Sequence, residues 1–364
     1  MNHTEEVKEP KKKKSVGKIL LIILACILLL AVLTVVIAGV FVGRWLNLIN
    51  KVEDTQSTLS SSELEALLNE NTETLDPDFT GEVLDATDVT WDTEPELIDE
   101  GPNVINIMLI GSDTRKMGVP SRSDTMVLCT LNKSAKTLTL TSFMRDMYVQ
   151  IPGCAANRIN VPYAIGGMSL LNKTLEKNFG VKVDGNFAVE FDSFKDVIDL
   201  VGGVDIVLNQ AEADYINTVK WGSEADMAQS KRNLTAGLNH MNGAEALAYS
   251  RNRTTGMSDF SRTERQRNVL TAIFNKCKNL SVAQLYKLME QVLPMLSTNM
   301  DNMTILRYAA QAAPLLSGLT LQTQRIPVDG AYRSAWVSGM AVLMPDLEAN
   351  RQVLREILTD EIAE

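Results

Sequence analysis

Residues 103–146 read NVINIMLIGSDTRKMGVPSRSDTMVLCTLNKSAKTLTLTSFMRD, and they contain three apolar runs, 104–110, 125–131 and 137–143. Runs of this length that are rich in β-branched and large apolar residues are typical of buried β-strands. The short polar link 132–136 joins the second run to the third, which is the pattern of an antiparallel hairpin. We therefore predict that three strands begin the folded part of the chain.

An acidic residue and an arginine stand at one end of each predicted strand: Asp113 with Arg115, Arg122 with Asp124, and Arg145 with Asp146. Antiparallel neighbours place the start of one strand beside the end of the next. Asp124 and Arg145 should therefore meet at one rim of the sheet, and Asp113 joins them if the first strand is a neighbour in the right direction. Carboxylates beside arginines suit a hard cation bridged to a phosphate. Ordinary surface ion pairing is the simpler explanation for a single pair, but three pairs at strand ends favour a site.

The N-terminal part of the chain predicts a membrane anchor. Residues 19–42 form a run of 24 residues without a charge, which is long enough to span a bilayer and too long for a typical signal-peptide core. Six lysines lie in residues 1–18, so the positive-inside rule predicts a cytoplasmic basic tail there and an extracellular remainder. We expect a retained, single-pass transmembrane helix at 19–42 and localisation to the cell membrane. The tail is too short to fold as a DNA-reading domain, so we expect no nucleic-acid partner.

Residues 43–101 are expected to form an acidic extracellular stem, because residues 52–101 contain 16 acidic residues and no basic residue. Repulsion between these charges favours an extended spacer. Residues 102–364 then form the extracellular domain.

The middle of the chain alternates helical and strand patterns. We predict a helix over 168–179, with Pro162 suited to a first helical turn, and then a strand over 187–191. A helix over 193–201 and a strand over 204–208 follow. Later elements are a helix after Asn242, one capped by Ser261 and Glu264, three more over 281–297, 302–317 and 345–359, and a strand over 320–326. This alternation indicates an α/β layered fold.

Histidine and cysteine content excludes several kinds of site. His3 and His240 are the two histidines of the chain, so a Ser-His-Asp triad or a multi-histidine zinc centre is poorly supported. The four cysteines contain no CxxC pair. Cys154 and Cys277 could form a disulfide outside the cell, and free thiols are at least as compatible with the spacing.

Five arginines between residues 251 and 267 form a second unusual feature, because Asp259 and Glu264 are the acidic residues in the same stretch. A solvated charged helix usually interleaves both signs. Clustered guanidinium groups match phosphate geometry better than lysines do. The sequence alone does not place this cluster beside the strand ends.

At these residues the chain resembles the LytR-CpsA-Psr family of cell-wall phosphotransferases. The matching motifs, in the family's order between residues 103 and 275, are Gly111-Ser112-Asp113 with Arg115, Arg122-Ser123-Asp124-Thr125, Ser142-Phe143-Met144-Arg145-Asp146, Arg158-Ile159-Asn160, 242–253 and 259–266. Two positions depart from the family: Asn252 replaces an aromatic or aliphatic residue, and Ser261 replaces a glycine. Both departures concern the shape of the loop more than the chemistry.

The resemblance implies a three-layer α/β/α domain around a mixed central sheet. It also implies transfer of a glycopolymer phosphate, of the teichoic acid or capsule type, from a polyprenyl-pyrophosphate carrier to a hydroxyl of peptidoglycan. Mg²⁺, or Mn²⁺ in its place, would assist. Three alternatives stay open: a hydrolase of the same carrier, a membrane-bound regulator of envelope genes, and a scaffold that binds the lipid-linked glycan without catalysis.

The resemblance also implies roles for individual residues. Asp113 and Asp124 would bind the metal ion, and the pyrophosphate would be held by Arg122, Arg145, Arg251, Arg253, Arg262 and Gln266. Arg145, Asp146, Arg251 and Arg262 would be the catalytic residues, with Asp146 orienting Arg145 or acting as a base. Arg265 and Arg267 are equally compatible with a structural role. A lipid cavity has as candidates Val127, Val189, Phe191, Phe194, Ile198, Val201 and Leu270, for each of which plain core packing is the simpler interpretation.

Overall fold

The structure is a computed structural model that describes residues 43–44, 46–52, 62, 74–75, 77, 79–91, 95–112, 122–218, 227–228, 230, 233–256 and 258–359. The chain divides into two compact units, residues 1–47 and 48–364. The predicted anchor at 19–42 and the predicted metal ligand Asp113 lie outside the described residues. Among the residues that are described, no helix has the length and apolar character needed to cross a bilayer.

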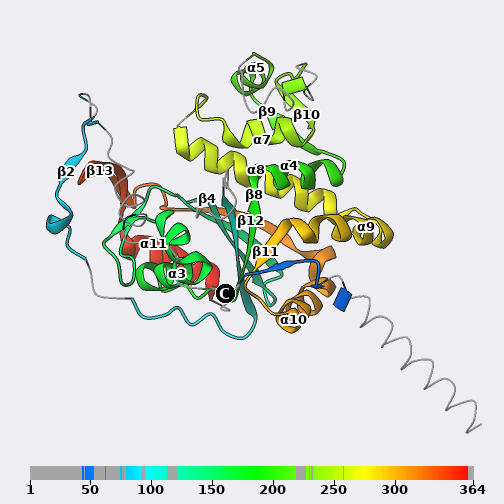
Figure 1. The fold of residues 1–364 in the computed structure, drawn as a ribbon, viewed down its shortest axis with the longest axis horizontal. Coiled ribbons are helices and arrows are strands. Elements are labelled where there is room, and N and C mark those ends of the chain that lie inside the picture. Colours follow the sequence, from blue (N-terminus) through cyan, green and yellow to red (C-terminus); the bar gives the residue numbers. More distant parts are fainter. Residues whose placement is uncertain are drawn as a thin grey trace, which may run out of the picture. The chain divides into compact units, whose positions relative to one another are not determined.

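A mixed sheet of seven strands forms the centre of the domain. Figure 1 shows the sheet with helices around it. Its order is β1 (Asn50–Lys51), β11 (Leu296–Thr298), β8 (Gly185–Glu190), β3 (Val104–Ser112), β4 (Ser123–Asn132), β5 (Thr137–Phe143) and β12 (Thr320–Ile326). Strands β3, β4 and β5 pair antiparallel, whereas β8 runs parallel to β3 and β12 runs parallel to β5. The three predicted strands, the hairpin between the last two and the late strand over 320–326 are therefore confirmed.

The register of the sheet brings the predicted charged ends together. Ser112 at the end of β3 lies opposite Ser123 at the start of β4, and β5 and β12 end on the same side. We call this edge the Ser112 rim. The register shifts between Gly111 and Ser112, so Asp124 is an extra residue in the β3–β4 ladder. Such a bulge commonly re-aims a side chain beside an active site.

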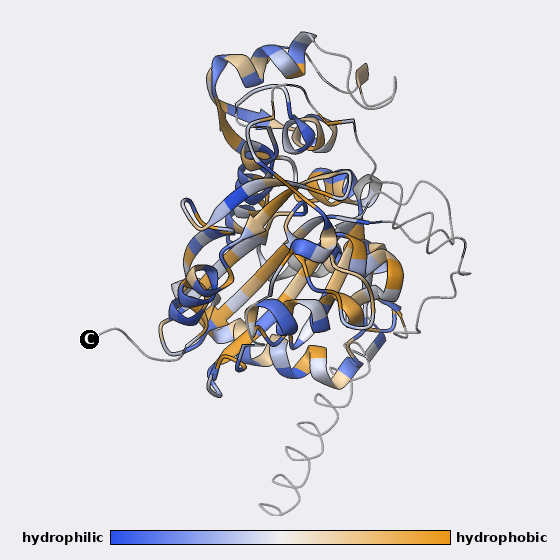
Figure 2. Ribbon diagram, turned by 90° about the vertical axis from the view of Figure 1, so that its left-hand side faces the viewer, coloured by the Kyte–Doolittle hydropathy of each residue, from blue (hydrophilic) through white to orange (hydrophobic). Residues whose placement is uncertain are grey.

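Helices cover both faces of the sheet, which gives the predicted three layers. On one face, α3 (Val161–Phe179) and α11 (Leu347–Leu358) contact β4 and each other. On the other face, α8 (Ser258–Lys278) contacts β5 and β12, and α4 (Phe191–Leu200) contacts β8. Figure 2 shows hydrophobic residues concentrated on the central strands. The main core includes Met108, Ile110, Met126, Leu128, Leu171, Leu175, Phe179, Leu354 and Leu358.

A smaller layer lies beyond α4 and α8. Strands β9 (Val204–Leu208) and β10 (Gly237–Met241) form an antiparallel pair, which packs with α5 (Gln210–Thr218) and α7 (Gly243–Arg251) around a separate apolar cluster. The predicted strand over 204–208 is thus present, but it pairs with β10 outside the central sheet.

The second half of the predicted stem differs from an extended spacer. Strand β2 (Glu82–Leu84) pairs with the C-terminal hairpin of β13 (Tyr332–Val337) and β14 (Met340–Pro345). The Trp91 ring stacks on Tyr148 at 5.8 Å between centroids, and Ile98 is buried in the main core. Sparse apolar residues therefore tie this acidic segment to the domain, because each of them finds a partner there.

Several helix boundaries differ from those we predicted. Helix α8 begins at Ser258 and not after Ser261, so Asp259 lies in its first turn. Helix α9 (Val282–Val292) ends early, a 3₁₀ turn (Leu293–Met295) follows, and β11 occupies residues that we assigned to a helix. Helix α10 (Asn302–Ala312) and α11 agree with the prediction within a few residues. Two short strands, β6 (Tyr148–Val149) and β7 (Asn157–Arg158), form a pair before α3.

Candidate active site

The turn after β5 carries Arg145 and Asp146 at the Ser112 rim. Met144 N donates to Ile326 O at 2.8 Å, and Leu343 N donates to Asp146 O at 2.9 Å, so the backbone on both sides of Arg145 is fixed. Arg145 Nη1 then donates to Asp124 Oδ1 at 2.6 Å. The predicted meeting of Asp124 and Arg145 is therefore confirmed.

The Arg158-Ile159-Asn160 segment packs beside this turn and stabilises it. Arg158 is buried, and its Nε and Nη2 donate to Ala341 O at 3.1 and 2.6 Å. Its Nε lies 3.8 Å from Asp146 Oδ1, and Asn160 O accepts from Ser123 N at 3.2 Å. The segment thus contacts Asp146 directly and fixes the backbone of Ser123, between Arg122 and Asp124. Its role is to hold the rim in shape.

Asp146 is a largely enclosed carboxylate between two guanidinium groups. Its Oδ2 lies 3.4 Å from Arg145 Nε, and its Oδ1 faces Arg158. Burial raises the pKa of Asp146 above its ordinary value, although Arg145 and Arg158 oppose this effect and Asp259 adds to it. The distances fit the orienting role that the resemblance implies for Asp146.

The start of α8 brings the second charged region to the same place. Asp259 Oδ1 lies 3.0 Å from Arg262 Nη2, 3.7 Å from Arg253 Nε and 3.8 Å from Arg145 Nη2. Residues more than 100 positions apart in the chain thus form one group, which we call the rim cluster: Asp124, Arg145, Asp146, Arg253, Asp259 and Arg262. We did not predict a role for Asp259. Its sequence signal is that it is one of two acidic residues among five arginines.

The arginines of the rim cluster are unequally compensated. Burial alone would lower the pKa of Arg145, but Asp146, Asp124 and Asp259 together raise it. For Arg262 burial dominates, and the neighbouring Arg145 also contributes, so the pKa of Arg262 falls to about 10. Its Nε is buried without a hydrogen-bond partner among the described residues. An anionic ligand would therefore stabilise this group, since a buried positive charge is costly without a partner.

A rigid loop presents Arg253 to the cluster. Asn252 is fully buried; its Oδ1 accepts from Thr254 N at 2.9 Å and its Nδ2 donates to Thr255 Oγ1 at 2.7 Å. The polar residue that departs from the family pattern thus folds the loop by side-chain to backbone bonds. Arg251 is exposed at the end of α7, two residues before Arg253.

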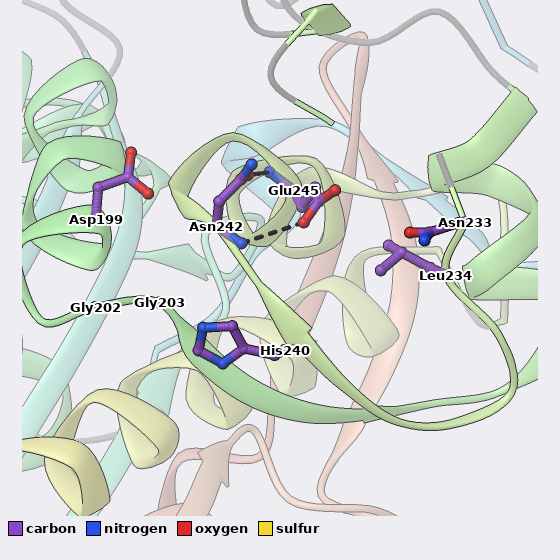
Figure 3. A pocket seen from close by; sticks show the side chains of 8 residues that line it. All are labelled: Asp199, Gly202, Gly203, Asn233, Leu234, His240, Asn242 and Glu245. Atoms are coloured by element: carbon purple, nitrogen blue, oxygen red, sulfur yellow. Dashed lines mark hydrogen bonds between the residues drawn. The ribbon is translucent and has the colours of Figure 1, made fainter. Parts of the chain in front are cut away.

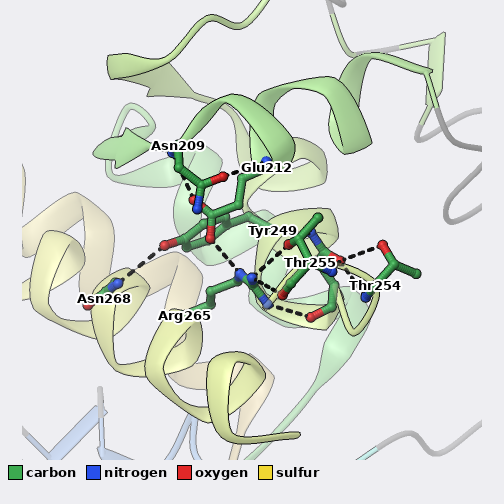
Figure 4. A network of polar contacts seen from close by, with 8 residues as sticks. Asn209, Glu212, Tyr249, Thr254, Thr255, Arg265 and Asn268 are labelled. Atoms are coloured by element: carbon green, nitrogen blue, oxygen red, sulfur yellow. Dashed lines mark hydrogen bonds and ion pairs between the residues drawn. The ribbon is translucent and has the colours of Figure 1, made fainter. Parts of the chain in front are cut away.

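Arg265 belongs to a separate network, shown in Figure 4. Its Nε lies 2.7 Å from Glu212 Oε1, its Nη1 donates to Asn252 O at 2.8 Å, and its Nη2 donates to Thr255 Oγ1 at 2.7 Å. These contacts favour the structural alternative for Arg265. The remaining predicted residues are near the cluster in sequence: Arg122 two positions before Asp124, and Gln266 one helical turn after Arg262, where it is partly buried.

A polar pocket lies away from the rim cluster, at the N-terminal end of α7 (Figure 3). Its volume is about 200 Å³. The polar groups around it serve the fold: Asn242 and Glu245 form a capping box, and Gly243 N donates to Asp199 Oδ1 at 2.7 Å. None of the predicted site residues lines it, so we assign it no role in the chemistry.

One face of the central sheet carries a row of partly exposed apolar side chains. Ile107 and Leu109 of β3 and Phe187 and Val189 of β8 point to the α8 side and are only half-buried, whereas Met108, Ile110 and Ala188 on the other face are buried. The row starts at the Ser112 rim and runs away from it. Of the lipid-cavity candidates, Val189, Phe194 and Leu270 are partly exposed, Val127, Ile198 and Val201 are buried core residues, and the side chain of Phe191 lies outside the description.

Of the two predicted metal ligands, the structure describes Asp124, whereas Asp113 lies outside the described residues. Among the described residues there is no group of three or more His, Cys, Asp or Glu side chains placed to bind a metal ion. Asp124 uses Oδ1 for Arg145, and its other oxygen makes no hydrogen bond to described residues. Carboxylate oxygens are the donors that Mg²⁺ prefers, and Mg²⁺ needs few protein ligands when phosphate and water complete its shell. Asp124 thus fits one ligand of such an ion. The cysteines at 129, 154 and 277 are free, so the disulfide alternative is wrong for Cys154 and Cys277.

Comparison with known proteins decides the family. The profile of the LytR-CpsA-Psr family matches residues 55–357, which is most of the chain. The chain belongs to the LytR-CpsA-Psr family. Among its relatives are two teichoic acid transferases of Bacillus subtilis strain 168, each named polyisoprenyl-teichoic acid–peptidoglycan teichoic acid transferase. TagV is 32% identical over 56% of this chain and 52% of its own length, and TagT is 31% identical over 61% and 66%.

Other members of the family carry other names or have solved structures. The regulatory protein MsrR of Staphylococcus aureus is 27% identical over 71% of this chain and 75% of its own length. The crystal structure of B. subtilis TagV matches with a TM-score of 0.57 at 29% identity, covering 71% of this chain and 98% of that one. TagT with bound octaprenyl pyrophosphate lipid matches with a TM-score of 0.51 at 25% identity, covering 71% and 90%. This chain spans about half of the curated length of TagV and two thirds of that of TagT.

Proposed function

We propose that this protein is a membrane-anchored phosphotransferase that moves a glycopolymer phosphate from a polyprenyl-pyrophosphate carrier to a hydroxyl of peptidoglycan. The observation that carries the proposal is the rim cluster, in which Arg145, Arg253 and Arg262 converge around Asp124 and Asp259. The names of TagV and TagT, and the octaprenyl pyrophosphate bound to TagT, support a teichoic-acid-like polymer as the cargo.

The chemistry needs alignment and charge neutralisation more than a covalent nucleophile. The acceptor hydroxyl oxygen attacks the phosphorus that carries the glycan, the bond to the bridging oxygen breaks, and polyprenyl phosphate leaves with the hydroxyl proton. Arg262 and Arg253 would neutralise the phosphate oxygens as charge builds up on them. Arg145, held by Asp124 and Asp146, would contact the bridging and departing oxygens. Arg251, Arg122 and Gln266 would complete the anion-binding surface.

The proposal assigns the metal site to Asp113 and Asp124, with Mg²⁺ or Mn²⁺ as the ion. A bound divalent ion would neutralise pyrophosphate charge and hold the carrier against Arg145. Asp124, which accepts from Arg145, would then serve both the guanidinium and the ion.

The half-buried apolar row is the proposed path of the polyprenyl tail. It begins beside the rim cluster and continues along β3 and β8, so a pyrophosphate at the rim would place its lipid on Val189, Phe187 and Leu109. Burial of apolar surface contributes roughly 25 cal/mol per Å², so a long prenyl chain gains substantial affinity from such a path. The anchor at 19–42 would hold the domain outside the cell membrane, where the carrier and peptidoglycan meet.

The experiment is transfer of lipid-linked polymer to peptidoglycan by the purified full chain. Arg145→Ala and Asp124→Ala should each abolish transfer while leaving the thermal unfolding transition cooperative. Arg355→Ala is the matched control, because Arg355 pairs with Glu348 at 2.8 Å on an exposed surface. It lies one turn before Thr359, whose carbonyl accepts from Asn132 at the end of β4 opposite the rim. Full polymer attachment by both rim variants would refute the proposal. Release of free glycan phosphate in place of attached polymer would identify a hydrolase.

A further inference from the structure

Helix α10 has an unusual surface for a helix at the outside of a domain. Met303 is 73% exposed and Leu306 is 40% exposed, and Ala310 continues the same stripe at the next turn. Arg307 is the one charged residue in the helix. Soluble helices normally place charged residues on their outer face, so an apolar outer stripe indicates that something apolar covers it.

The inner face of α10 is already used by the fold. Tyr308 and Ala312 pack in one cluster with Ile105 and Leu131 of the central sheet, and Ile107 belongs to the same cluster. The helix is therefore apolar on two sides. The inner side contacts the far end of the half-buried row, and the outer side is left to another partner.

The segment that follows the proposed membrane anchor joins the domain beside α10. Strand β1 pairs with β11, and Lys51 Nζ donates to Met300 O at 2.9 Å, one residue before the N-cap Asp301 of α10. The uncharged run ends at Val42, eight residues before Asn50. Eight extended residues reach at most about 28 Å. The start of α10 is therefore at the end of the domain to which this short linker is attached.

The sheet places α10 at the opposite end from the chemistry. Strand β11 runs away from the Ser112 rim, and the Met300 side chain fills the space above Gly185 at the far end of β8. Gly185 lies opposite Ile107, five residues before Ser112, so roughly 17 Å separates this position from the rim. A domain resting on α10 would hold the rim cluster away from the bilayer, with the apolar row between them.

We infer that the outer face of α10 inserts into the headgroup region of the outer membrane leaflet and fixes the orientation of the domain. The occupant is the lipid bilayer itself: Met303 and Leu306 enter the apolar boundary, and Arg307 stays at headgroup level. The inference rests on the proposed membrane anchor. In this orientation the end of the apolar row farthest from the Ser112 rim lies at the bilayer. A carrier tail can then enter the row without crossing water.

The test uses the full chain reconstituted in nanodiscs, with a tryptophan introduced as a local probe. Met303→Trp reports on α10, and Leu238→Trp is the matched control, because Leu238 is also 73% exposed but lies on β10 in the smaller layer. The added fluorescence of each variant is measured against the unaltered chain, in ordinary lipid and in lipid brominated near the top of the acyl chains. Iodide in the aqueous phase is the complementary quencher.

We expect brominated lipid to remove roughly half of the added signal of Met303→Trp and none of that of Leu238→Trp, with iodide showing the reverse order. Equal quenching of the two variants by brominated lipid would overturn the inference. Protection of the Met303→Trp signal from both quenchers would also overturn it, because the cover would then be another segment of this chain or a second copy.

The result separates this inference from the proposed function. If the chain does not enter nanodiscs at all, the anchor is absent and the inference fails with it. If the chain is incorporated and the added signal of Met303→Trp is not quenched by the lipid, the inference fails alone. The substitution lies outside the rim cluster, so transfer activity measured on the same sample tests the proposed function independently.

Discussion

Arg262 and Arg265 lie one turn apart on the same helix and are equally buried, at 4% and 3% exposure, yet their surroundings differ. Arg265 is hydrogen-bonded to a carboxylate, a backbone carbonyl and a hydroxyl. Arg262 has Asp259 at 3.0 Å, faces a second arginine, and keeps a buried Nε without a partner among the described residues. A buried charge with all its partners stabilises a loop, whereas one that lacks partners is ready for a ligand.

The first way to break this comparison is to remove Arg262. Arg262→Ala should lower the rate of polymer transfer by about 10³-fold, about 4 kcal/mol of transition-state stabilisation. The free energy of unfolding should change little, since the lost group is poorly compensated in the folded protein. Transfer kinetics and urea denaturation of the same sample test both parts. An unfolded variant would show that Arg262 is structural after all.

Removal of Arg265 should have the opposite profile. Arg265→Ala leaves the buried Glu212 without its partner and should cost about 3 kcal/mol of stability, with activity per folded molecule largely retained. Arg265→Met combined with Glu212→Leu should recover much of that loss, because a buried pair can be replaced by packed apolar groups. A catalytic defect in the stable double variant would place Arg265 in the chemistry.

The proposed metal site gives Asp124 two partners, Arg145 and a divalent ion, so its substitution should affect the metal requirement of transfer. Chelation of divalent ions should reduce transfer by about 100-fold, and added Mg²⁺ or Mn²⁺ should restore it. Asp124→Asn should raise the Mg²⁺ concentration needed for half-maximal rate. Asp329→Asn, at an exposed acid that pairs with Arg325, is the control and should leave it unchanged. Undiminished transfer in the presence of chelator would exclude a role for the ion.

Substitution of Asn252 should have smaller effects, on both stability and activity, because its loop carries Arg253 and also contacts Arg265. Asn252→Ala removes the bonds to Thr254 and Thr255 and should cost about 1–2 kcal/mol of stability. Because the loop presents Arg253, KM for the lipid-linked donor should rise more than kcat falls. Asn252→Asp keeps the accepting oxygen and should recover part of both losses. A fall in kcat with unchanged KM would contradict a role for this loop in binding the lipid-linked donor.

The smallest expected effect is a pH dependence of stability. It comes from Glu100, which belongs neither to the rim cluster nor to the network around Arg265. Burial raises the pKa of Glu100 to about 7. The folded state therefore binds this proton more tightly than the unfolded state, and the stability from Glu100 is fully present below about pH 4.5 and lost as pH rises through about 7. Glu100→Gln should stabilise the protein by about 1 kcal/mol near pH 8 and have no effect at acidic pH, since solvent screens part of the shift. Denaturation series at the two pH values measure the difference, and equal effects would contradict it.

The sequence predicted the strand part of the site because a hairpin has a simple register. Once 132–136 is a tight turn, Asp124 and Arg145 must approach each other, and they do so at 2.6 Å. The distinction between Arg262 and Arg265 had no such basis. Both lie on adjacent positions of one helical face, and only the partner Glu212, 53 residues earlier in the chain, separates their roles.

The parts of the fold that we missed depend on distant partners. Strand β2 is a three-residue strand in an acidic segment, and it forms because β13 offers an edge. Strand β11 follows a helical pattern that Pro294 interrupts, a stop signal that our prediction of a helix over 281–297 passed over. Its pairing with β8 and β1 then determines its conformation. Asp259 is an ordinary helix-start acid by sequence, and its contacts with three arginines depend on how α8 packs against the sheet.

The most direct test of the account is the affinity of the full chain for geranylgeranyl pyrophosphate with Mg²⁺, measured by calorimetric titration. We predict that Arg145→Ala weakens binding by about 100-fold, whereas the Arg265→Met and Glu212→Leu double variant stays within about threefold of the unaltered chain. Equal affinity in all three proteins would contradict the claim that the rim cluster is a pyrophosphate site.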